Sequence, residues 1–410
     1  MLQPIALGHK SLADYTHVAG PPLIVEVREL AEQLQGLKVL HLSATAFGGG
    51  VAEILYTLIP LMNDVGIEAE WQVMLGREEF YNVTKRLHNA LQGNPDSLST
   101  EEWQIFERYN EMNAGELSDG WDVIIIHDPQ PLAIRGHVPD HGRTWVWRCH
   151  IDLSTPNDDA IEHIVPHVRG YDESVFHLQD YVPPGLDGTN VNICPPAIDP
   201  LSPKNMAFSP DDAAFVCDQF GLDVDRPLMC QVSRFDPWKD PMGVIDAYRV
   251  VKEEMPDVQL ALVGSMALDD PEGWEFFNST MAYADGDPDV HILNNLNQVG
   301  AIEVNAFQSQ ADVVIQKSTR EGFGLTVSEA LWKARPFIGG DVGGIPLQVR
   351  DGETGYLVSS PEECADRSLR ILREPDLGRR LGRSGKEHVR QHFLTPRLLR
   401  DWLRIFSRAA

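Results

Sequence analysis

Two glutamates flank a glycine-containing stretch of the chain, REGFGLTVSEA (320–330). An apolar run at 311–318 precedes it and a helix-forming run follows, so we expect Glu321 in a loop and Glu329 within a helix. Because a helix rises ~1.5 Å per residue, a spacing of eight positions puts the carboxylates roughly 12 Å apart. A retaining glycosidase needs its carboxylates at ~5 Å, and an inverting one at no more than ~9.5 Å. The two glutamates must therefore do separate jobs.

The turn between them predicts a site for a nucleotide sugar. Backbone N–H groups at a helix N-terminus attract anions, so they would bind phosphate and sugar oxygens. Glu321 would then bind hexose hydroxyls, and Glu329 would bind the ribose diol. The amides concerned belong to Gly322, Phe323, Gly324, Leu325 and Thr326. The alternative is that both acids only complement the helix dipole.

Two cations lie at the end of another expected strand, 227–236, and just beyond it. Arg234 and Lys239 stand five positions apart in SRFDPWKD, with a turn between them. A guanidinium and an ammonium that converge on one strand end can neutralise a diphosphate leaving group. The alternative is an exposed basic pair neutralised by Asp236 and Asp240.

A glycine turn, Gly48-Gly49-Gly50, closes the apolar run 37–44 and opens a helical pattern. Bare backbone amides at such a helix start can receive a phosphate, although an ordinary turn explains the glycines equally well. The sequence is not GxGxxG and no Walker lysine follows it. Nicotinamide-dinucleotide and P-loop functions therefore lose support.

His150 ends the apolar and aromatic stretch RTWVWRCH (143–150) of the expected strand 143–152, and Asp152 follows two positions later. The imidazole can donate a hydrogen bond to a sugar hydroxyl or to developing charge, and Asp152 can bind the hydroxyls of a second sugar. A purely structural histidine is the alternative.

These residues lie where strands of a parallel sheet would end. Apolar runs alternate with helical patterns, stop at a proline-rich segment, 192–205, and then start again. Such alternation predicts the α/β class, with two doubly wound domains joined near residue 200. Ligands bind such sheets at the carboxyl ends of the strands. The remaining expected strands are 121–128, 173–181, 259–265 and 289–295.

Composition narrows the class of protein further. A length of 410 residues suits two domains, and no apolar run is long enough for a membrane span, which predicts a soluble protein. With 34 basic and 61 acidic residues the net charge is −27, which disfavours nucleic acid and anionic lipid as partners. The five scattered cysteines and an N-terminus without a secretory pattern indicate idle thiols in a reducing cytoplasm. Short DxD sequences at 223/225, 285/287 and 287/289 fit solvated turns better than a metal site, so no metal site is expected.

The whole set resembles the retaining glycosyltransferases of family 4, which have the GT-B fold. The resemblance rests on the two glutamates, the cations of SRFDPWK, the GGG turn and GGDVGGIPLQVRDGETGYLV (339–358). Within that family HIDLSTPN and NICPPAIDPLSPKN are similar to the trehalose synthases, which transfer glucose from a nucleotide donor to free glucose. The resemblance implies two Rossmann-like domains facing each other across a cleft. These are an acceptor-binding domain, 1–200, and a donor-binding domain, 201–390, with a last helix at about 391–410 packed on the first.

The resemblance also implies roles for single residues. Glu321 and His150 would contact the donor hexose, and Arg234 and Lys239 the diphosphate. Glycine amides from the other domain would approach the phosphates, and the base would lie near the end of the run 289–295. These further positions are Gly49 or Gly50 for the phosphates, Glu329 for the ribose, Asn295 and Leu296 for the base, and Asp152 for the acceptor.

The implied reaction retains configuration without a protein nucleophile. The leaving diphosphate would take the acceptor proton on one face of an oxocarbenium-like sugar. The implied partners are glucose and UDP-, ADP- or GDP-glucose, with a homodimer as one assembly. No cofactor is required, apart from magnesium that the nucleotide sugar can bring. The alternatives are another acceptor sugar, a trehalose phosphorylase, a nucleotide-sugar epimerase and a non-catalytic binding module.

Overall fold

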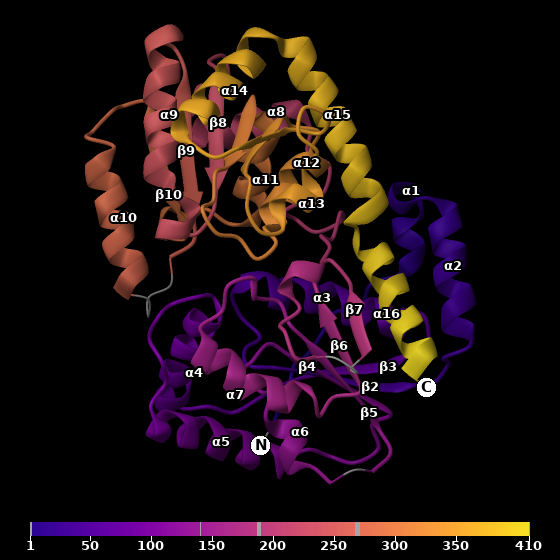
Figure 1. Ribbon diagram of the computed structural model, residues 1–410. Helices are drawn as coiled ribbons and strands as arrows, with labels where there is room; N and C mark the ends of the chain where they lie inside the picture. The colour runs from indigo at the N-terminus through magenta and orange to yellow at the C-terminus, as the bar shows by residue number, and fades with distance from the viewer. Residues whose placement is uncertain (1, 140, 187–189, 267–270, 410) are drawn as a thin grey trace. The chain divides into compact units, whose positions relative to one another are not determined.

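The computed structural model describes residues 2–139, 141–186, 190–266 and 271–409. The chain forms two compact units (Figure 1). Unit 1 comprises Met1–Ala197 together with Thr395–Ala410, and unit 2 comprises Ile198–Leu394. The expected α/β class with two doubly wound, Rossmann-like units is confirmed.

Unit 1 is built on a seven-stranded sheet with the order β1-β3-β2-β4-β5-β6-β7. All neighbouring pairs are parallel except β1 with β3. The inner strands read as nearly unbroken apolar runs because helices cover both faces. The strands are β1 (Gln3–Pro4), β2 (Lys38–Ser43), β3 (Glu68–Val73), β4 (Val123–His127), β5 (Thr144–Arg148), β6 (Glu173–Phe176) and β7 (Asn190–Ile193).

Helices of unit 1 pack on this sheet. The first turn of α5 carries a capping box, in which the Ser99 hydroxyl accepts from the Glu102 N–H and the Glu102 side chain accepts from the Ser99 N–H. The helices are α1 (Thr16–Ala19), α2 (Pro21–Glu32), α3 (Gly49–Asp64), α4 (Glu78–Leu91), α5 (Thr100–Ala114), α6 (Ile134–His137), α7 (Asp158–Val168) and α16 (Thr395–Ala409).

Helix α16 packs on α2 and α3, although it is the last helix of the chain (Figure 1). Its apolar face buries Leu399, Trp402 and Phe406, each at most 2% exposed. The buried guanidinium of Arg397 donates from Nη1 to the carbonyl oxygen of Pro195 (2.9 Å) and from Nη2 to that of Pro196 (2.8 Å). Apolar burial and these two bonds fix the start of the helix to the end of the unit's first segment.

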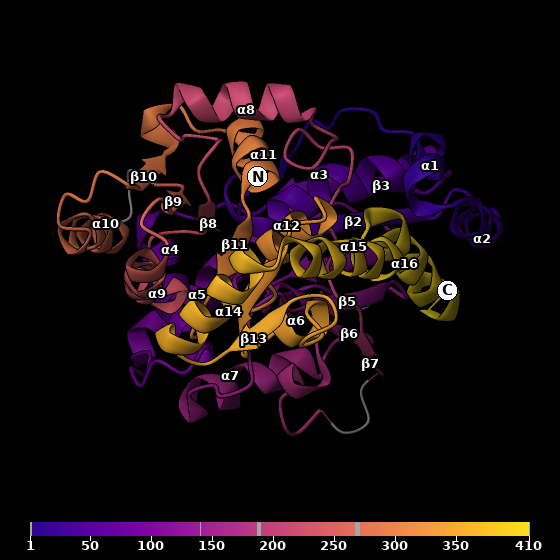
Figure 2. The ribbon, with the colours of Figure 1, turned by 90° about the horizontal axis from the view of Figure 1, so that it is seen from above.

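Unit 2 has a six-stranded, wholly parallel sheet with the order β10-β9-β8-β11-β12-β13. Its strands are β8 (Leu228–Val232), β9 (Gln259–Gly264), β10 (Val290–Asn294), β11 (Val313–Gln316), β12 (Phe337–Gly340) and β13 (Tyr356–Val358). Helix α8 packs beside α11 and α9 beside α14 (Figure 2). The helices are α8 (Pro210–Gln219), α9 (Pro241–Glu254), α10 (Pro271–Tyr283), α11 (Ala301–Gln310), α12 (Leu325–Trp332), α13 (Ile345–Gln348), α14 (Pro361–Arg373) and α15 (Pro375–His392).

Every apolar run expected to form a strand contains one, but five strands were not anticipated. Strand β7 takes the first residues of the proline-rich segment, so only the part of that segment after Ile193 connects the units. None of the described helices is long and apolar enough to cross a membrane. All five cysteines are buried and free, in agreement with the expectation of idle thiols.

Candidate active site

Two adjacent strands of unit 2 bring a lysine and a glutamate together. Lys239 ends a short 3-10 turn after β8, and Glu321 lies in the loop between β11 and α12. Because β8 and β11 are neighbours and parallel, their carboxyl ends meet at one edge of the sheet. The ammonium Nζ of Lys239 donates to Oε2 of Glu321 at 2.7 Å. The sequence predicted both residues, and the structure brings them into contact.

The surroundings of this ion pair hold it in place. Asp236 caps the turn, since its side chain accepts from the Lys239 backbone N–H. The backbone N–H of Thr319 donates to the carbonyl of Trp238 at 2.8 Å, which ties the two loops together. The side chains of Lys239 and Glu321 are only 13% and 10% exposed, so the Coulomb attraction between them is weakly screened.

Glu329 lies inside α12, as expected, and is 1% exposed. Its Oε1 is 3.2 Å from the ammonium of Lys204, which is not aligned for a hydrogen bond. Within the described residues neither carboxylate oxygen accepts a hydrogen bond. Buried carboxylates normally have such partners, so Glu329 keeps acceptor capacity that a ligand with hydroxyl groups can use.

Lys333 and the segment around Asn205 support this carboxylate. Lys333 donates to the backbone carbonyl of Glu329 at 3.1 Å and to Oδ1 of Asn205 at 3.2 Å. The indole of Trp332 donates to the Asn205 carbonyl at 3.1 Å. These contacts fix Lys204, the neighbour of Asn205, beside α12. Sequence reasoning missed Lys204, because it lies 125 positions from Glu329.

The amides of 322–326 form the turn into α12. Gly324 caps the helix in the left-handed region (φ 79°), where a side chain would be strained. Gln348, at the end of α13, donates to the carbonyl of Phe323 at 2.6 Å. Its Oε1 accepts from Ser328 at 2.5 Å. The turn is therefore held by the glycine-rich stretch 339–358, which explains why these two motifs occur together.

Arg234 behaves differently from Lys239. Its side chain is 68% exposed, and its Nη2 lies 3.2 Å from Oδ2 of Asp236. Arg234 is therefore exposed and paired with Asp236, which is what the alternative of a neutralised surface pair predicted. Asp240 instead pairs with Lys317, not with Lys239. The diphosphate role of Arg234 stays a prediction.

The expected base position lies directly after β10. The Asn295 side chain accepts from the backbone N–H of Met266 at 2.7 Å and donates to its carbonyl at 3.1 Å. The N–H of Leu296 is already bonded to Oδ1 of Asn294 at 2.8 Å. Its side chain is 54% exposed. Leu296 therefore offers an apolar surface to a base, while its N–H is engaged.

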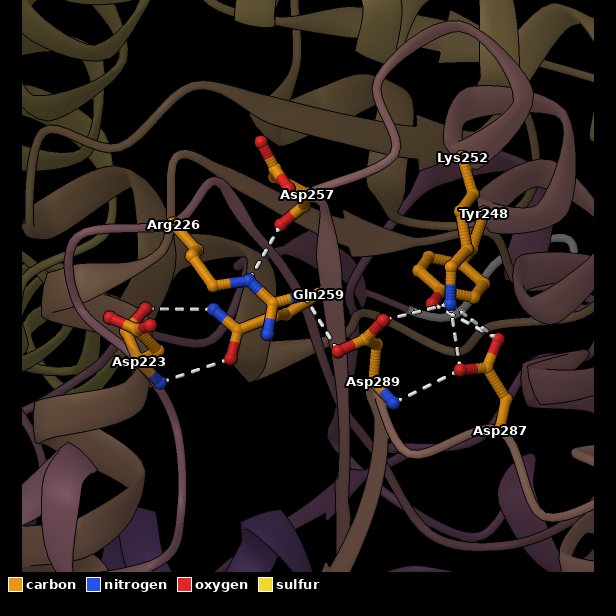
Figure 3. A network of polar contacts seen from close by, with 8 residues as sticks. All are labelled: Asp223, Arg226, Tyr248, Lys252, Asp257, Gln259, Asp287 and Asp289. Carbon is orange, nitrogen blue, oxygen red and sulfur yellow. Dashed lines mark hydrogen bonds and ion pairs between the residues drawn. The ribbon is translucent and has the colours of Figure 1, made fainter.

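Three of the DxD aspartates, Asp223, Asp287 and Asp289, belong to a separate group of polar contacts (Figure 3). Lys252 in α9 donates to Asp287 at 2.7 Å and to Asp289 at 2.9 Å, and Arg226 donates to Asp289 at 2.6 Å. Hydrogen bonds from Lys252 and Arg226 hold the pKa of Asp289 below its ordinary value. For Asp287, burial raises the pKa, but the bonds from Lys252 outweigh that effect and lower it.

This network lies at the amino ends of β8, β9 and β10, because Arg226 precedes β8, Gln259 starts β9 and Asp289 precedes β10. On its other side, Gln259 exchanges two bonds with the backbone of Asp223, at 3.0 and 2.7 Å. Bound ligands are expected at the opposite edge of such a sheet. We therefore assign these aspartates a structural role at the amino ends of β8, β9 and β10. Among the described residues no three His, Cys, Asp or Glu side chains gather as a metal site would need.

In unit 1 the glycine turn begins α3. Gly48 and Gly49 have φ angles of 72° and 76°, and, apart from the adjoining backbone, no described atom lies within 4 Å of where a Cβ would stand on either. The backbone conformation, not crowding, is therefore the reason for glycine at both positions. Gly50 lies in the first turn of α3, beside the helix N-terminus where the sequence predicted a phosphate.

His150 follows β5 and is half-buried. Its backbone N–H donates to Oδ1 of Asp128 at 2.7 Å, and its Nε2 is 2.9 Å from Nδ1 of His127. Burial lowers the pKa of His150 well below its ordinary value, and the Arg148 charge adds to this effect. Asp152 is 4% exposed, and its Oδ1 accepts from the N–H of Ser154 at 2.8 Å.

Asp128 is a residue that the sequence analysis missed. It directly follows β4 with a φ of 65°, an uncommon conformation for a residue with a side chain. Burial raises the pKa of its carboxyl to about 7. Strained backbone and a raised carboxyl pKa at a strand end are typical of functional positions. The sequence contains a signal for this position, because His127 and Asp128 stand directly before a proline at the end of the expected strand 121–128.

Comparison with known proteins agrees with the fold. Residues 216–388 match the family described as glycosyl transferases group 1, and residues 41–183 match the N-terminal domain of trehalose synthase. The sucrose-phosphate synthase of Thermosynechococcus elongatus has a similar fold, with a TM-score of 0.71 at 18% identity over 90% of this chain and 98% of that one. Fold and family together define a glycosyltransferase of the GT-B class.

Two relatives give the family within that class. The trehalose synthase of Rubrobacter xylanophilus is 56% identical over 100% of this chain and 99% of its own length. That of Pyrococcus horikoshii is 45% identical over 98% of this chain and 97% of its own length. The chain belongs to the trehalose synthase family. The resemblance stated from the motifs is thereby confirmed.

Proposed function

We propose that the protein transfers glucose, with retention, from a nucleoside diphosphate glucose to free glucose and so makes trehalose. The observation that carries the proposal is the pair of carboxylates around the start of α12. Glu329 is buried with unused acceptor capacity, and Glu321 is held by Lys239 at the same sheet edge. One suits a ribose diol, and the other suits a hexose beside a diphosphate. Membership of the trehalose synthase family supports trehalose as the product.

In this proposal the nucleotide sugar lies across the turn into α12. Lys239 and the amides of 322–326 bear the charge of the diphosphate, and Arg234 turns from solvent toward it. Glu321 accepts bonds from hexose hydroxyls. Asn295 and Leu296 flank the base, whose identity separates UDP-, ADP- and GDP-glucose as donors.

The reaction then needs no protein nucleophile. The bond from anomeric carbon to diphosphate oxygen breaks as the acceptor hydroxyl attacks from the same face. The hydroxyl proton passes to a diphosphate oxygen, which gains basicity as it leaves. The enzyme contributes positioning, and its cations and amides stabilise the departing charge. From unit 1, His150 supplies a contact to the donor hexose, Asp152 one to the acceptor, and Gly49 or Gly50 one to phosphate. Magnesium would enter only with the nucleotide.

The test uses the purified protein with UDP-, ADP- and GDP-glucose in turn, each with and without glucose. Products are separated by chromatography and identified by NMR. The expected result is a non-reducing α,α-linked disaccharide that forms only when one donor and glucose are both present. A disaccharide with another linkage would refute the trehalose product.

Three further arms separate the other activities. Trehalose with inorganic phosphate would give glucose 1-phosphate in a phosphorylase. Donor that changes its sugar without an acceptor would indicate an epimerase. A panel of other monosaccharides as acceptors tests the choice of glucose. Turnover in any of these arms, with none for donor plus glucose, would overturn the proposal.

A further inference from the structure

Four histidines lie within or just after four adjacent strands of unit 1, in the half of each strand toward its carboxyl end. The order β2-β4-β5-β6 in the sheet places His41, His127, His150 and His177 in one row. His41 belongs to β2 and His127 ends β4, while the other two follow β5 and β6. Only His150 was singled out from the sequence.

Three of these rings form a continuous hydrogen-bonded chain. Nδ1 of His41 is 3.0 Å from Nε2 of His127, and Nδ1 of His127 is 2.9 Å from Nε2 of His150. The rings are stacked with centroids 5.3 and 5.2 Å apart and interplanar angles of 19° and 21°. His41 is 0% and His127 is 2% exposed, so water has little access to either link.

The chain is uncharged at neutral pH. Burial lowers the pKa of His41 to about 3 and that of His127 well below its ordinary value. The groups around it also oppose protonation: the Arg148 guanidinium lowers the pKa of both His127 and His150, and the His177 ring, 5.5 Å from His150, lowers that of His150. Asp128 is the nearby acid, and it accepts from the His150 backbone N–H.

A neutral imidazole has one N–H, so each link must contain a single proton. If one ring changes tautomer, every ring in the chain has to change with it. Only two arrangements satisfy both links: all three rings protonated on Nδ1, or all three on Nε2.

The environment of His41, the buried end of this row of hydrogen-bonded rings, favours one of the two arrangements. Nε2 of His41 is buried and has no hydrogen-bond partner among the described residues. Protonation on Nε2 would make it an orphaned N–H, which is rarer in proteins than an orphaned acceptor. The Nδ1 arrangement leaves only a lone pair there. It also gives the half-buried His150 an N–H on the ring nitrogen that does not face His127.

We propose that His41 and His127 are positioning residues that hold His150 as a neutral Nδ1–H donor with a fixed ring orientation. Neither touches substrate; both act through His150, which presents that N–H to a sugar oxygen. The part concerning substrate rests on the proposed function, whereas the tautomer does not. A ring flip of His150 would lose its bond to His127, so the orientation is favoured over its flipped form.

The tautomers can be measured without any substrate. Protein labelled with 15N-histidine gives long-range 1H–15N spectra in which Nδ1–H, Nε2–H and imidazolium forms differ. Spectra of the His41→Gln, His127→Asn and His150→Gln variants assign the signals. We expect His150 as Nδ1–H at neutral pH. An Nε2–H tautomer, or imidazolium at neutral pH, would overturn the proposal even if the protein makes trehalose.

Two replacements of His127 test the link itself. The side-chain amide introduced by His127→Asn can still donate from the place of Nδ1, whereas His127→Leu removes the donor altogether. We expect the leucine variant to lose at least about tenfold in kcat/KM and to show mixed His150 tautomers, because a catalytic imidazole in the wrong tautomer is impaired. The asparagine variant should keep the Nδ1–H signal and recover most of the activity.

A control variant separates this from general damage. His163→Asn, in α7 of the same unit, removes a histidine that stacks on Trp103 outside the chain and should leave kcat/KM unchanged. Equal losses in the two His127 variants while His150 stays Nδ1–H would show that the chain only packs. If the leucine variant does not fold, the wild-type spectrum and the asparagine variant still test whether His150 is held as the Nδ1–H tautomer.

Discussion

Glu329 gives a direct test of where the nucleotide binds. Its carboxylate is 1% exposed and accepts no hydrogen bond from the described residues, and the ammonium of Lys204 lies 3.2 Å from it. If a ribose diol binds there, both hydroxyls gain a charged acceptor that gives up no bond within the protein. Glu329→Ala removes this acceptor, and Glu329→Gln keeps one neutral oxygen of similar shape.

The expected loss follows from the number of bonds. A hydrogen bond to a charged group contributes about 1.5 to 3 kcal/mol. Two such bonds at the lower value give about 3 kcal/mol for Glu329→Ala, or roughly 150-fold in Kd. Glu329→Gln should lose about half of that free energy, which is roughly tenfold. Glu303→Ala, which changes an acid at the start of α11 in the same unit, serves as the control.

The assay is titration calorimetry with UDP, ADP and GDP, followed by the 2′,3′-dideoxy form of whichever binds. Wild-type protein should prefer the ribonucleotide by about the same 3 kcal/mol. The alanine variant should bind both forms with nearly equal, weak affinity. If wild-type protein does not discriminate, or if the alanine variant still does, Glu329 does not bind the ribose.

Three other perturbations have defined outcomes. Lys239→Ala and Arg234→Ala should each lower kcat/KM by an amount that corresponds to about 2 to 4 kcal/mol of transition-state stabilisation, as the loss of an oxyanion donor does. Near-normal kcat/KM in both variants would refute the leaving-group role. His41 is neutral when folded, with a pKa of about 3, so unfolding takes up a proton below the unfolded value of about 6.5. The contribution of neutral His41 to the free energy of unfolding is therefore complete above that pH and is lost as the pH falls. Denaturant titrations should show a loss of about 2 kcal/mol from this residue between pH 7 and 5. In a His41→Gln variant the free energy of unfolding should depend correspondingly less on pH. Lys252→Met leaves Asp287 without its cation and should cost about 1 to 2 kcal/mol of stability at pH 7. Because Lys252 holds the pKa of Asp287 below its ordinary value, this loss should begin to shrink below about pH 4 and should vanish only once the pH is below that lowered pKa. A loss that does not shrink at all as the pH falls below about 4 would show that packing is responsible.

Most strands could be predicted from the sequence because buried parallel strands have few polar residues. Strands β4 (VIIIH) and β8 (LMCQV) each contain a single polar residue, and they were expected from that apolar pattern alone. Strand β3, EAEWQV, was missed because it is only half-buried and carries two glutamates. Strand β12, FIGG, is short and half glycine, so its place in the sheet depends on its neighbours and not on its own propensity.

Some site residues could likewise be predicted from a local motif, whereas others could not. Lys239 and Glu321 belong to motifs whose position at strand ends can be read locally. The chain of histidines cannot be read so, because His41 and His127 are 86 positions apart and their contact depends on the register of two strands. The same holds for Lys204 beside Glu329, which is set by long-range packing of the segment after Ile198. A single sequence gives the chemistry of such residues but not their pairing.

The return of α16 to unit 1 has a consequence for synthesis of the chain. The Arg397 bond to Pro195 joins residues 202 positions apart, and about 200 residues of unit 2 are made between the two segments of unit 1. At ~5 to 20 residues per second the ribosome needs roughly 10 to 40 s for that stretch. During this time the apolar surface that Trp402 and Phe406 later cover is open to water and to chaperones. Unit 2 can therefore complete its fold first, although its sequence is translated second.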